Sequence, residues 1–136
     1  MIERYGSGER MSLAVSYRGL FETAGVVADD LRQDVQGQLR QALSTIDGLM
    51  AEANVGKEHL TRVQLWIADY SHFDLVNEVY DAWLQGCPKP PRACVGADLG
   101  EGYLVEVQVF AVCPERSWPR ATDAPGQHTA RGTALT

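Results

Sequence analysis

The pattern that most constrains the fold is a one-sided apolar stripe across residues 34–53. Its apolar residues recur every three to four positions, as in an amphipathic helix: Val35, Leu39, Ala42, Leu43, Ile46, Leu49, Met50 and Ala53. Asp34 is placed to cap the helix N-terminus. Gly37 and Gly48 each weaken its intrinsic propensity by about 1 kcal/mol. Packing must therefore hold this helix, and the chain has to supply an apolar surface that receives it.

Strand patterns on both sides supply that surface. Residues 12–17 and 20–24 are β-prone and flank Arg18-Gly19, which predicts a hairpin. Further along, the pattern predicts a strand over 60–67, a helix over 71–84 capped by Asp69 or Ser71, and strands over 92–97 and 103–112. The stripe of the second helix is read as core and comprises Phe73, Val76, Asn77, Tyr80, Trp83 and Leu84.

The predicted order is β-β-α-β-α-β-β, an α+β fold with a mixed sheet. Strand–helix–strand crossovers give parallel neighbours, and hairpins give antiparallel ones. Two helices cover one face of the sheet, which leaves the other face for a second copy of the chain. Residues 114–136 lack apolar periodicity and predict a flexible tail. Residues 1–113 then form one domain.

Composition excludes several classes of function. The net charge is −6 and the pI is about 4.9, which opposes binding to nucleic acid or to anionic membranes. No apolar run is long enough to span a bilayer, and the N-terminus lacks the apolar core of a signal peptide. Cys87, Cys94 and Cys113 form neither a disulfide framework nor a zinc motif. We therefore expect a cytoplasmic protein without a metal.

Two charged residues stand out on the last two predicted strands. Arg92 opens the first strand and Glu106 lies within the second. If a short connection makes these strands neighbours, their side chains come close together. An arginine binds carboxylates through two parallel hydrogen bonds, and a glutamate can hold or activate water. The pair predicts a site for a carboxylate-bearing small molecule, with a structural ion pair between strands as the alternative.

Several segments, in this order, resemble the RidA (YjgF) family of reactive-intermediate deaminases. They are TAG at 23–25, QAL at 41–43, VQLWIAD at 63–69, FDLVNEVY at 73–80, PRACV at 91–95 and VEV at 105–107. The resemblance covers about residues 2–113. It implies a chorismate-mutase-like fold and a homotrimer with clefts between subunits. The implied reaction is hydrolysis of enamines and imines, such as 2-aminoacrylate and 2-iminobutanoate, to 2-oxo acids and ammonia, without a cofactor.

The resemblance also implies roles for three residues. Arg92 matches the arginine that holds the substrate carboxylate, and Cys94 matches a position whose backbone lines the pocket. Glu106 matches the glutamate that positions the hydrolytic water. Covalent catalysis by Cys94 is a weaker alternative, because no histidine lies within local reach to activate the thiol.

The opening residues 2–6 and 10–12 resemble a divergent branch of the family. The chain also departs from the family pattern in three places. Ala24 and Val26 replace polar residues, Met11 replaces a tyrosine, and the stretch between Arg92 and Glu106 is one residue shorter. These losses favour a second hypothesis, a non-catalytic module that binds small carboxylates. A third hypothesis, an endoribonuclease or translation inhibitor, is opposed by the acidic charge and the lack of a basic aromatic patch.

Overall fold

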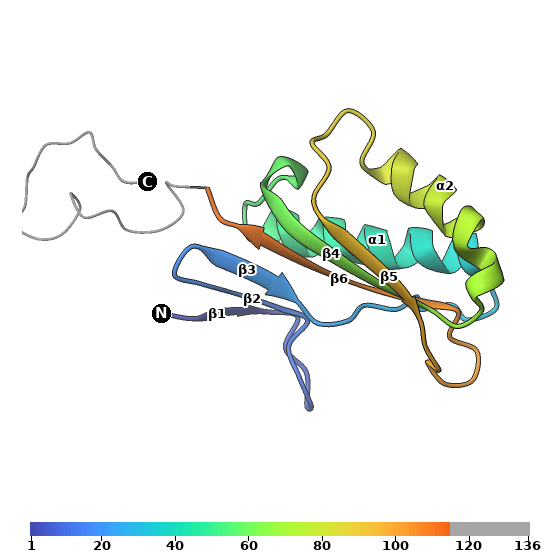
Figure 1. The fold of residues 1–136 in the computed structure, drawn as a ribbon. Coiled ribbons are helices and arrows are strands. Elements are labelled where there is room, and N and C mark those ends of the chain that lie inside the picture. Colours follow the sequence, from blue (N-terminus) through green and yellow to red (C-terminus); the bar gives the residue numbers. More distant parts are fainter. Residues whose placement is uncertain (115–136) are drawn as a thin grey trace, which may run out of the picture.

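The computed structural model describes residues 1–114 and shows two helices packed on one face of a six-stranded sheet (Figure 1). The strands are β1 (Glu3–Tyr5), β2 (Ala14–Tyr17), β3 (Leu20–Thr23), β4 (Leu60–Ile67), β5 (Arg92–Gly96) and β6 (Val105–Val112). The helices are α1 (Val35–Glu52) and α2 (Phe73–Trp83), with 3-10 turns at Lys57–His59 and Tyr70–His72. Neither α1 nor α2 has the length and apolar character needed to cross a membrane. The predicted tail lies outside the described residues, apart from Pro114.

Most of the predicted elements are confirmed. Arg18 and Gly19 join β2 to β3 with φ values of 50° and 79°, the backbone that a tight two-residue hairpin turn requires. Asp34 caps α1, since its Oδ1 accepts the N–H of Gly37 at 2.8 Å. The helix predicted over 71–84 begins at Phe73. Asp69 instead caps the 3-10 turn before it, by accepting the N–H of Ser71 at 3.0 Å.

The sheet order is β1-β2-β3-β6-β4-β5, and it corrects the sequence analysis in two places. The short edge strand β1 was not predicted, because three mostly exposed residues carry no alternating pattern. The expectation that the last two strands are neighbours was wrong, because β4 lies between β5 and β6. Every second residue of β6 is buried, and most of these residues are valines. In its central position β6 pairs with both β3 and β4, and α1 packs over it.

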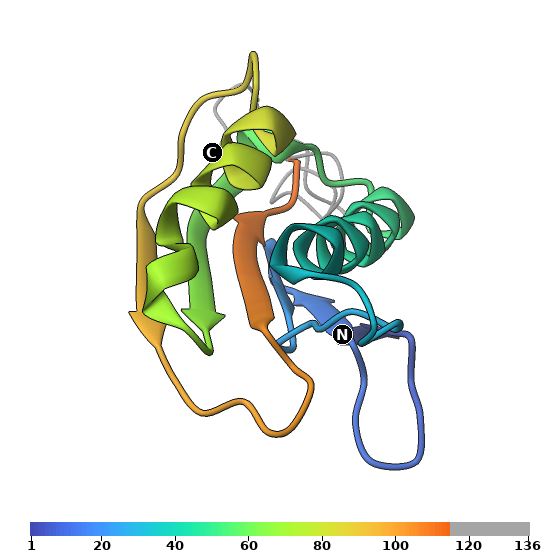
Figure 2. The same cartoon turned by 90° about the vertical axis from the view of Figure 1, so that its right-hand side faces the viewer.

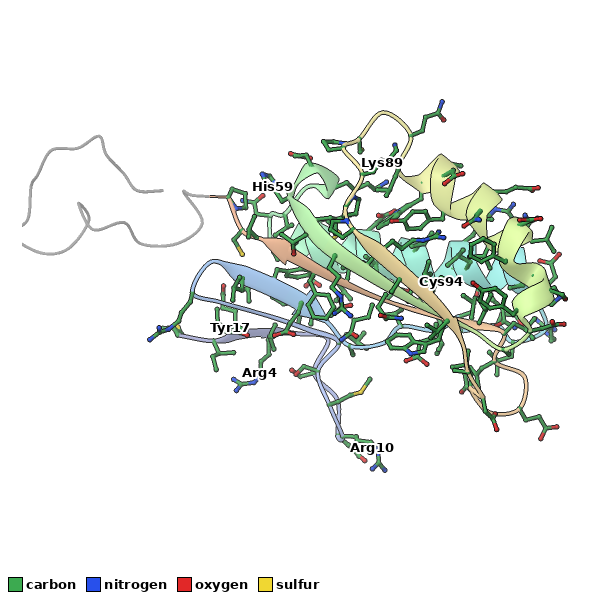
Figure 3. All side chains as sticks on the ribbon, in the orientation of Figure 1. Arg4, Arg10, Tyr17, His59, Lys89 and Cys94 are labelled. Atoms are coloured by element: carbon green, nitrogen blue, oxygen red, sulfur yellow. The ribbon has the colours of Figure 1, made fainter. Side chains whose placement is uncertain are left out.

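The side-chain alternation of the strands assigns every residue of the sheet to one of two faces. The helices α1 and α2 cover one face of the sheet (Figure 2). Val63, Leu65, Val107 and Val109 are fully buried on that face. Within residues 1–114, no helix covers the opposite face. That uncovered face carries Arg62, Gln64, Trp66, Glu106, Gln108 and Phe110, and Arg4 and Tyr17 project on the same side, away from the helices (Figure 3).

A buried glutamine of α1 binds two loops, one before α1 at residues 31–33 and one before β6 at residues 102–104. The Gln38 side chain has no exposed surface. Its Nε2 lies 3.3, 3.2 and 3.0 Å from the carbonyl oxygens of Leu31, Gln33 and Gly102, and its Oε1 accepts the N–H of Leu104 at 3.0 Å. One side chain therefore fixes the entry into β6, the strand that carries Glu106.

Replacing Gln38 with leucine is expected to destabilise the fold strongly. The change nearly keeps the volume but removes the partner of three carbonyl groups and one N–H in part-buried surroundings. Each such group that stays without a partner costs about 1–3 kcal/mol. We expect a loss of about 3 kcal/mol or more in the free energy of unfolding, measured by denaturant titration. Gln36→Leu on the partly exposed face of α1 is the control. Equal, small losses in the two variants would show that the Gln38 network contributes little.

Candidate active site

Arg92 lies on the helix side of the sheet. It pairs in register with Val63, so its side chain shares the face of that buried valine. Its Nη1 donates to Oδ1 of Asn77 at 2.8 Å. The guanidinium carbon lies 4.8 Å from the ring centre of Tyr80 and 5.7 Å from that of Phe73. Because positions 73, 77 and 80 share one face of α2, this helix surrounds one side of the guanidinium.

Among residues 1–114, the guanidinium uses little of its hydrogen-bonding capacity. Arginine has five N–H donors, and the contact with Asn77 uses one of them. Within residues 1–114, none of the recorded ion pairs includes Arg92. The side chain is half-buried, which reduces the screening of its charge by water. The site can therefore take a planar anion, a carboxylate above all, through two parallel hydrogen bonds.

Cys94 lies two residues beyond Arg92, on the same face of β5. Burial raises the pKa of its thiol, and the charge of Arg92 opposes this shift only in part. A raised pKa means a smaller thiolate fraction at neutral pH, and the thiolate is the nucleophile. This environment argues against covalent catalysis by Cys94.

Cys94 should accordingly be a slow target for alkylation. Because the pKa of Cys94 is raised, its thiolate fraction at neutral pH is smaller than that of an ordinary thiol. The pH profile of its alkylation therefore shifts to higher pH. At pH 7 we expect iodoacetamide to alkylate Cys94 more slowly than it alkylates the thiol of glutathione. The rate of Cys94 alkylation should still rise above pH ~8.5, the ordinary thiol pKa. Mass spectrometry of the peptide carrying Cys94 gives the rate. Alkylation at pH 7 that outpaces glutathione would mean an activated thiol.

Glu106 lies on the opposite face of the sheet. It pairs with Trp66 and is half-buried. A Cβ atom on Gly25 would overlap its carboxylate, so the glycine allows this close approach. Val26 and Val107 exchange backbone hydrogen bonds of 2.7 and 3.0 Å, which hold this segment beside β6. The TAG motif at 23–25 thus acquires a structural meaning, because it makes room for the carboxylate of Glu106.

Arg92 and Glu106 do not meet within one chain. Arg92 pairs in register with Val63 of β4. Glu106 pairs in register with Trp66, three positions further along β4. Val63 and Trp66 face opposite sides of the sheet. The expected close approach was therefore wrong, and the described chain contains no ion pair between these residues. A shared cleft requires a second copy of the chain.

Other residues singled out by the sequence have different environments. Val26 is 4% exposed and belongs to the core, so it adds nothing to a pocket surface. Met11 is 50% exposed in the connection between β1 and β2. Asn77 was assigned to a core stripe, and its role beside Arg92 was missed. The available signal was one polar side chain inside an otherwise apolar stripe.

The groove between α1 and α2 forms a cavity of about 500 Å³ away from these residues. It is lined by Gln36, Arg40, Leu43, Ser44, Asp47, Glu78, Val79, Ala82 and Trp83. Its carboxylates already have partners in the structure. Asp47 accepts the indole N–H of Trp83 at 2.8 Å, and Glu78 accepts from Gln36 at 3.0 Å. Arg92, Cys94 and Glu106 do not line this cavity, so the groove is separate from the candidate site.

Comparison with known proteins identifies relatives over most of the chain. The family described as "Endoribonuclease L-PSP" matches residues 1–113. A RutC family protein of Haemophilus ducreyi is 30% identical over 112 residues, which cover 82% of this chain and 96% of that protein. The RutC family protein YoaB of Escherichia coli is 27% identical over 111 residues, covering 81% and 96% of the two chains.

Solved structures agree with this relationship. A member of the YjgF protein family from Neisseria meningitidis superposes with a TM-score of 0.79 at 30% identity, covering 85% of this chain and 97% of the other. An uncharacterised protein from Pseudomonas aeruginosa gives a TM-score of 0.78 at 29% identity, covering 82% and 98%. The two helices on a mixed sheet are therefore the shared architecture, and the identities of about 30% fit a divergent branch.

Proposed function

The chain belongs to the endoribonuclease L-PSP family, together with the RutC and YjgF proteins, and from this premise we propose that it hydrolyses small enamine and imine carboxylates to 2-oxo acids and ammonia. The observation that carries the proposal is Arg92, a half-buried guanidinium that is oriented by α2 and has no carboxylate partner among the described residues. Substrates of the 2-aminoacrylate and 2-iminobutanoate type present the planar carboxylate that such a group binds.

The proposed reaction needs few catalytic groups. An enamine first tautomerises to the imine, whose protonated C=N carbon is electrophilic. Glu106 accepts a proton from water as the oxygen forms its bond to this carbon, which gives a carbinolamine. Glu106 then passes its proton to the nitrogen. As the C–N bond breaks, the hydroxyl oxygen forms the C=O bond and gives its proton back to Glu106. The products are ammonia and a 2-oxo acid. Arg92 contributes orientation of the carboxylate, and Glu106 contributes general-base catalysis.

We place this site between two copies of the chain, with Arg92 from one subunit and Glu106 from its neighbour. Two features support a shared site. β5 is an edge strand, so Arg92 lies at an open border of the sheet. The uncovered face carries Leu20, Val95 and Val112 at 46%, 44% and 37% exposure, and a partner would bury this apolar surface. A homotrimer closes such a head-to-tail contact into a ring.

A homotrimer has a simple signature in solution. Light scattering coupled to size-exclusion chromatography should give three times the 14.9 kDa of the single chain. We expect this mass to persist at about 1 μM protein, because a specific interface of this kind is stable in that range. A stable monomer would leave Arg92 and Glu106 on opposite faces of the sheet and would contradict the shared site.

The test of the reaction generates 2-aminoacrylate or 2-iminobutanoate in situ and follows 2-oxo acid and ammonia formation. The expected result is an acceleration over buffer that scales with protein concentration. No acceleration across a panel of small imino acids would contradict the hydrolase. Retained carboxylate binding in the same preparation would instead identify a non-catalytic binding module, the reading that Met11 and Ala24 favour.

A further inference from the structure

We propose that Asn77 is a positioning residue that orients the guanidinium of Arg92 without neutralising it, so that the site selects carboxylate anions. This inference rests on the proposed role of Arg92 in the function above. It concerns a residue of α2 rather than of the strands that carry Arg92 and Glu106. Asn77 acts through Arg92, by the hydrogen bond of 2.8 Å between its Oδ1 and Nη1 of the arginine.

Two kinds of contact fix the guanidinium. The rings of Tyr80 and Phe73 lie 4.8 and 5.7 Å from its central carbon, and such contacts favour the cation electrostatically. Tyr80 is itself held in the core at 7% exposure, which makes it a firm support. Asn77 then adds one directional hydrogen bond. Together, the rings confine the position of the cation, and the amide oxygen sets its rotation.

The neutrality of residue 77 is the decisive property. Arg32 shows the alternative, since its Nε and Nη2 donate to the two carboxylate oxygens of Asp30 at 2.9 and 3.1 Å. That pair already uses the bidentate edge that an incoming carboxylate needs. At Arg92, the asparagine amide provides one acceptor oxygen and no negative charge. The remaining donors and the full positive charge stay available for a ligand.

Asn77→Asp separates orientation from charge. The aspartate keeps an acceptor oxygen at the same place, so the fold is expected to remain intact, but it supplies an internal anion for Arg92. We expect affinity for 2-oxobutanoate to fall about tenfold or more, because a charged internal partner competes directly with the ligand. The midpoint of thermal unfolding should stay the same or rise. Calorimetric titration and thermal unfolding of the full chain measure the two quantities.

Two further variants complete the comparison. Asn77→Ala removes the hydrogen bond but leaves the charge free, so affinity should fall less than in Asn77→Asp, and KM for imine hydrolysis should rise more than kcat falls. Gln85→Glu adds the same negative charge at an exposed site outside α2. It should bind 2-oxobutanoate as the wild type does, which shows that the effect at position 77 is local.

The outcomes distinguish this inference from the proposed function. Asn77→Asp that binds 2-oxobutanoate with wild-type affinity overturns the positioning role, even if the wild type hydrolyses imines. A wild type that binds 2-oxobutanoate but hydrolyses no imine overturns the hydrolase, and the loss of binding in Asn77→Asp then still supports the positioning role. A wild type that binds no 2-oxobutanoate overturns the carboxylate site itself.

Discussion

Arg92→Ala is expected to lose at least about 100-fold in kcat/KM for imine hydrolysis, and Arg92→Lys should recover little of that loss. Two hydrogen bonds to a charged ligand contribute about 1.5–3 kcal/mol each, and each 1.4 kcal/mol corresponds to a factor of ten. Lysine retains the charge but not the planar fork that matches a carboxylate. It also lacks a flat group to pack against Tyr80. Formation of the 2-oxo acid measures both variants.

A matched control separates the loss of the site from a general effect of arginine replacement. Arg40→Lys makes the same substitution at an exposed position of α1, in the groove away from the site. It should retain wild-type activity. Thermal unfolding and light scattering must show that the Arg92 variants remain folded and assembled. If folded Arg92 variants keep full activity, the contacts of Arg92 with α2 are only structural.

The local structure could largely be predicted from the sequence, because local physics determines it. The alternation in β4 and β6 correctly predicted which valines are buried. The apolar stripe from Val35 to Ala53 correctly predicted α1 and its cap at Asp34. Strand order could not be predicted in the same way. A short connection between 97 and 104 is compatible with a hairpin and also with a path across the end of β4. Ala97 and Ala68 show the second path, since their N–H groups bond to Ile67 and Leu104.

This single error in strand order changes the view of the site. Two neighbouring strands would have placed Arg92 and Glu106 in one cleft of one chain. In the observed order, Arg92 pairs with Val63 of β4 and Glu106 pairs with Trp66 of β4. Side chains alternate along a strand, so Arg92 and Glu106 lie on opposite faces of the sheet. Asn77 was missed for a related reason, because a stripe pattern shows which residues face inward but not which strand they meet. The contact between α2 and β5 depends on the parallel crossover, a property of the tertiary fold.

Mixed trimers should recover activity that neither parent variant has. Glu106→Gln is expected to lose about 10²–10⁴-fold in kcat through loss of the general base, and Arg92→Ala loses the carboxylate clamp. If each site takes Arg92 from one subunit and Glu106 from the next, a trimer that contains both variants has one intact site. Its activity should be about one third of the wild-type value, by the threefold arrangement of the sites.

The experiment uses coexpression of the two variants with different affinity tags, followed by purification on both tags in sequence. Each variant coexpressed with a differently tagged copy of itself is the control, and these trimers should stay inactive. Recovery to about one third identifies a site completed across the interface. No recovery in trimers of confirmed mixed composition would mean that one chain supplies both groups. A Glu106→Gln parent that keeps wild-type activity would mean that Glu106 takes no part. Because the two residues lie on opposite faces of one sheet, we expect recovery.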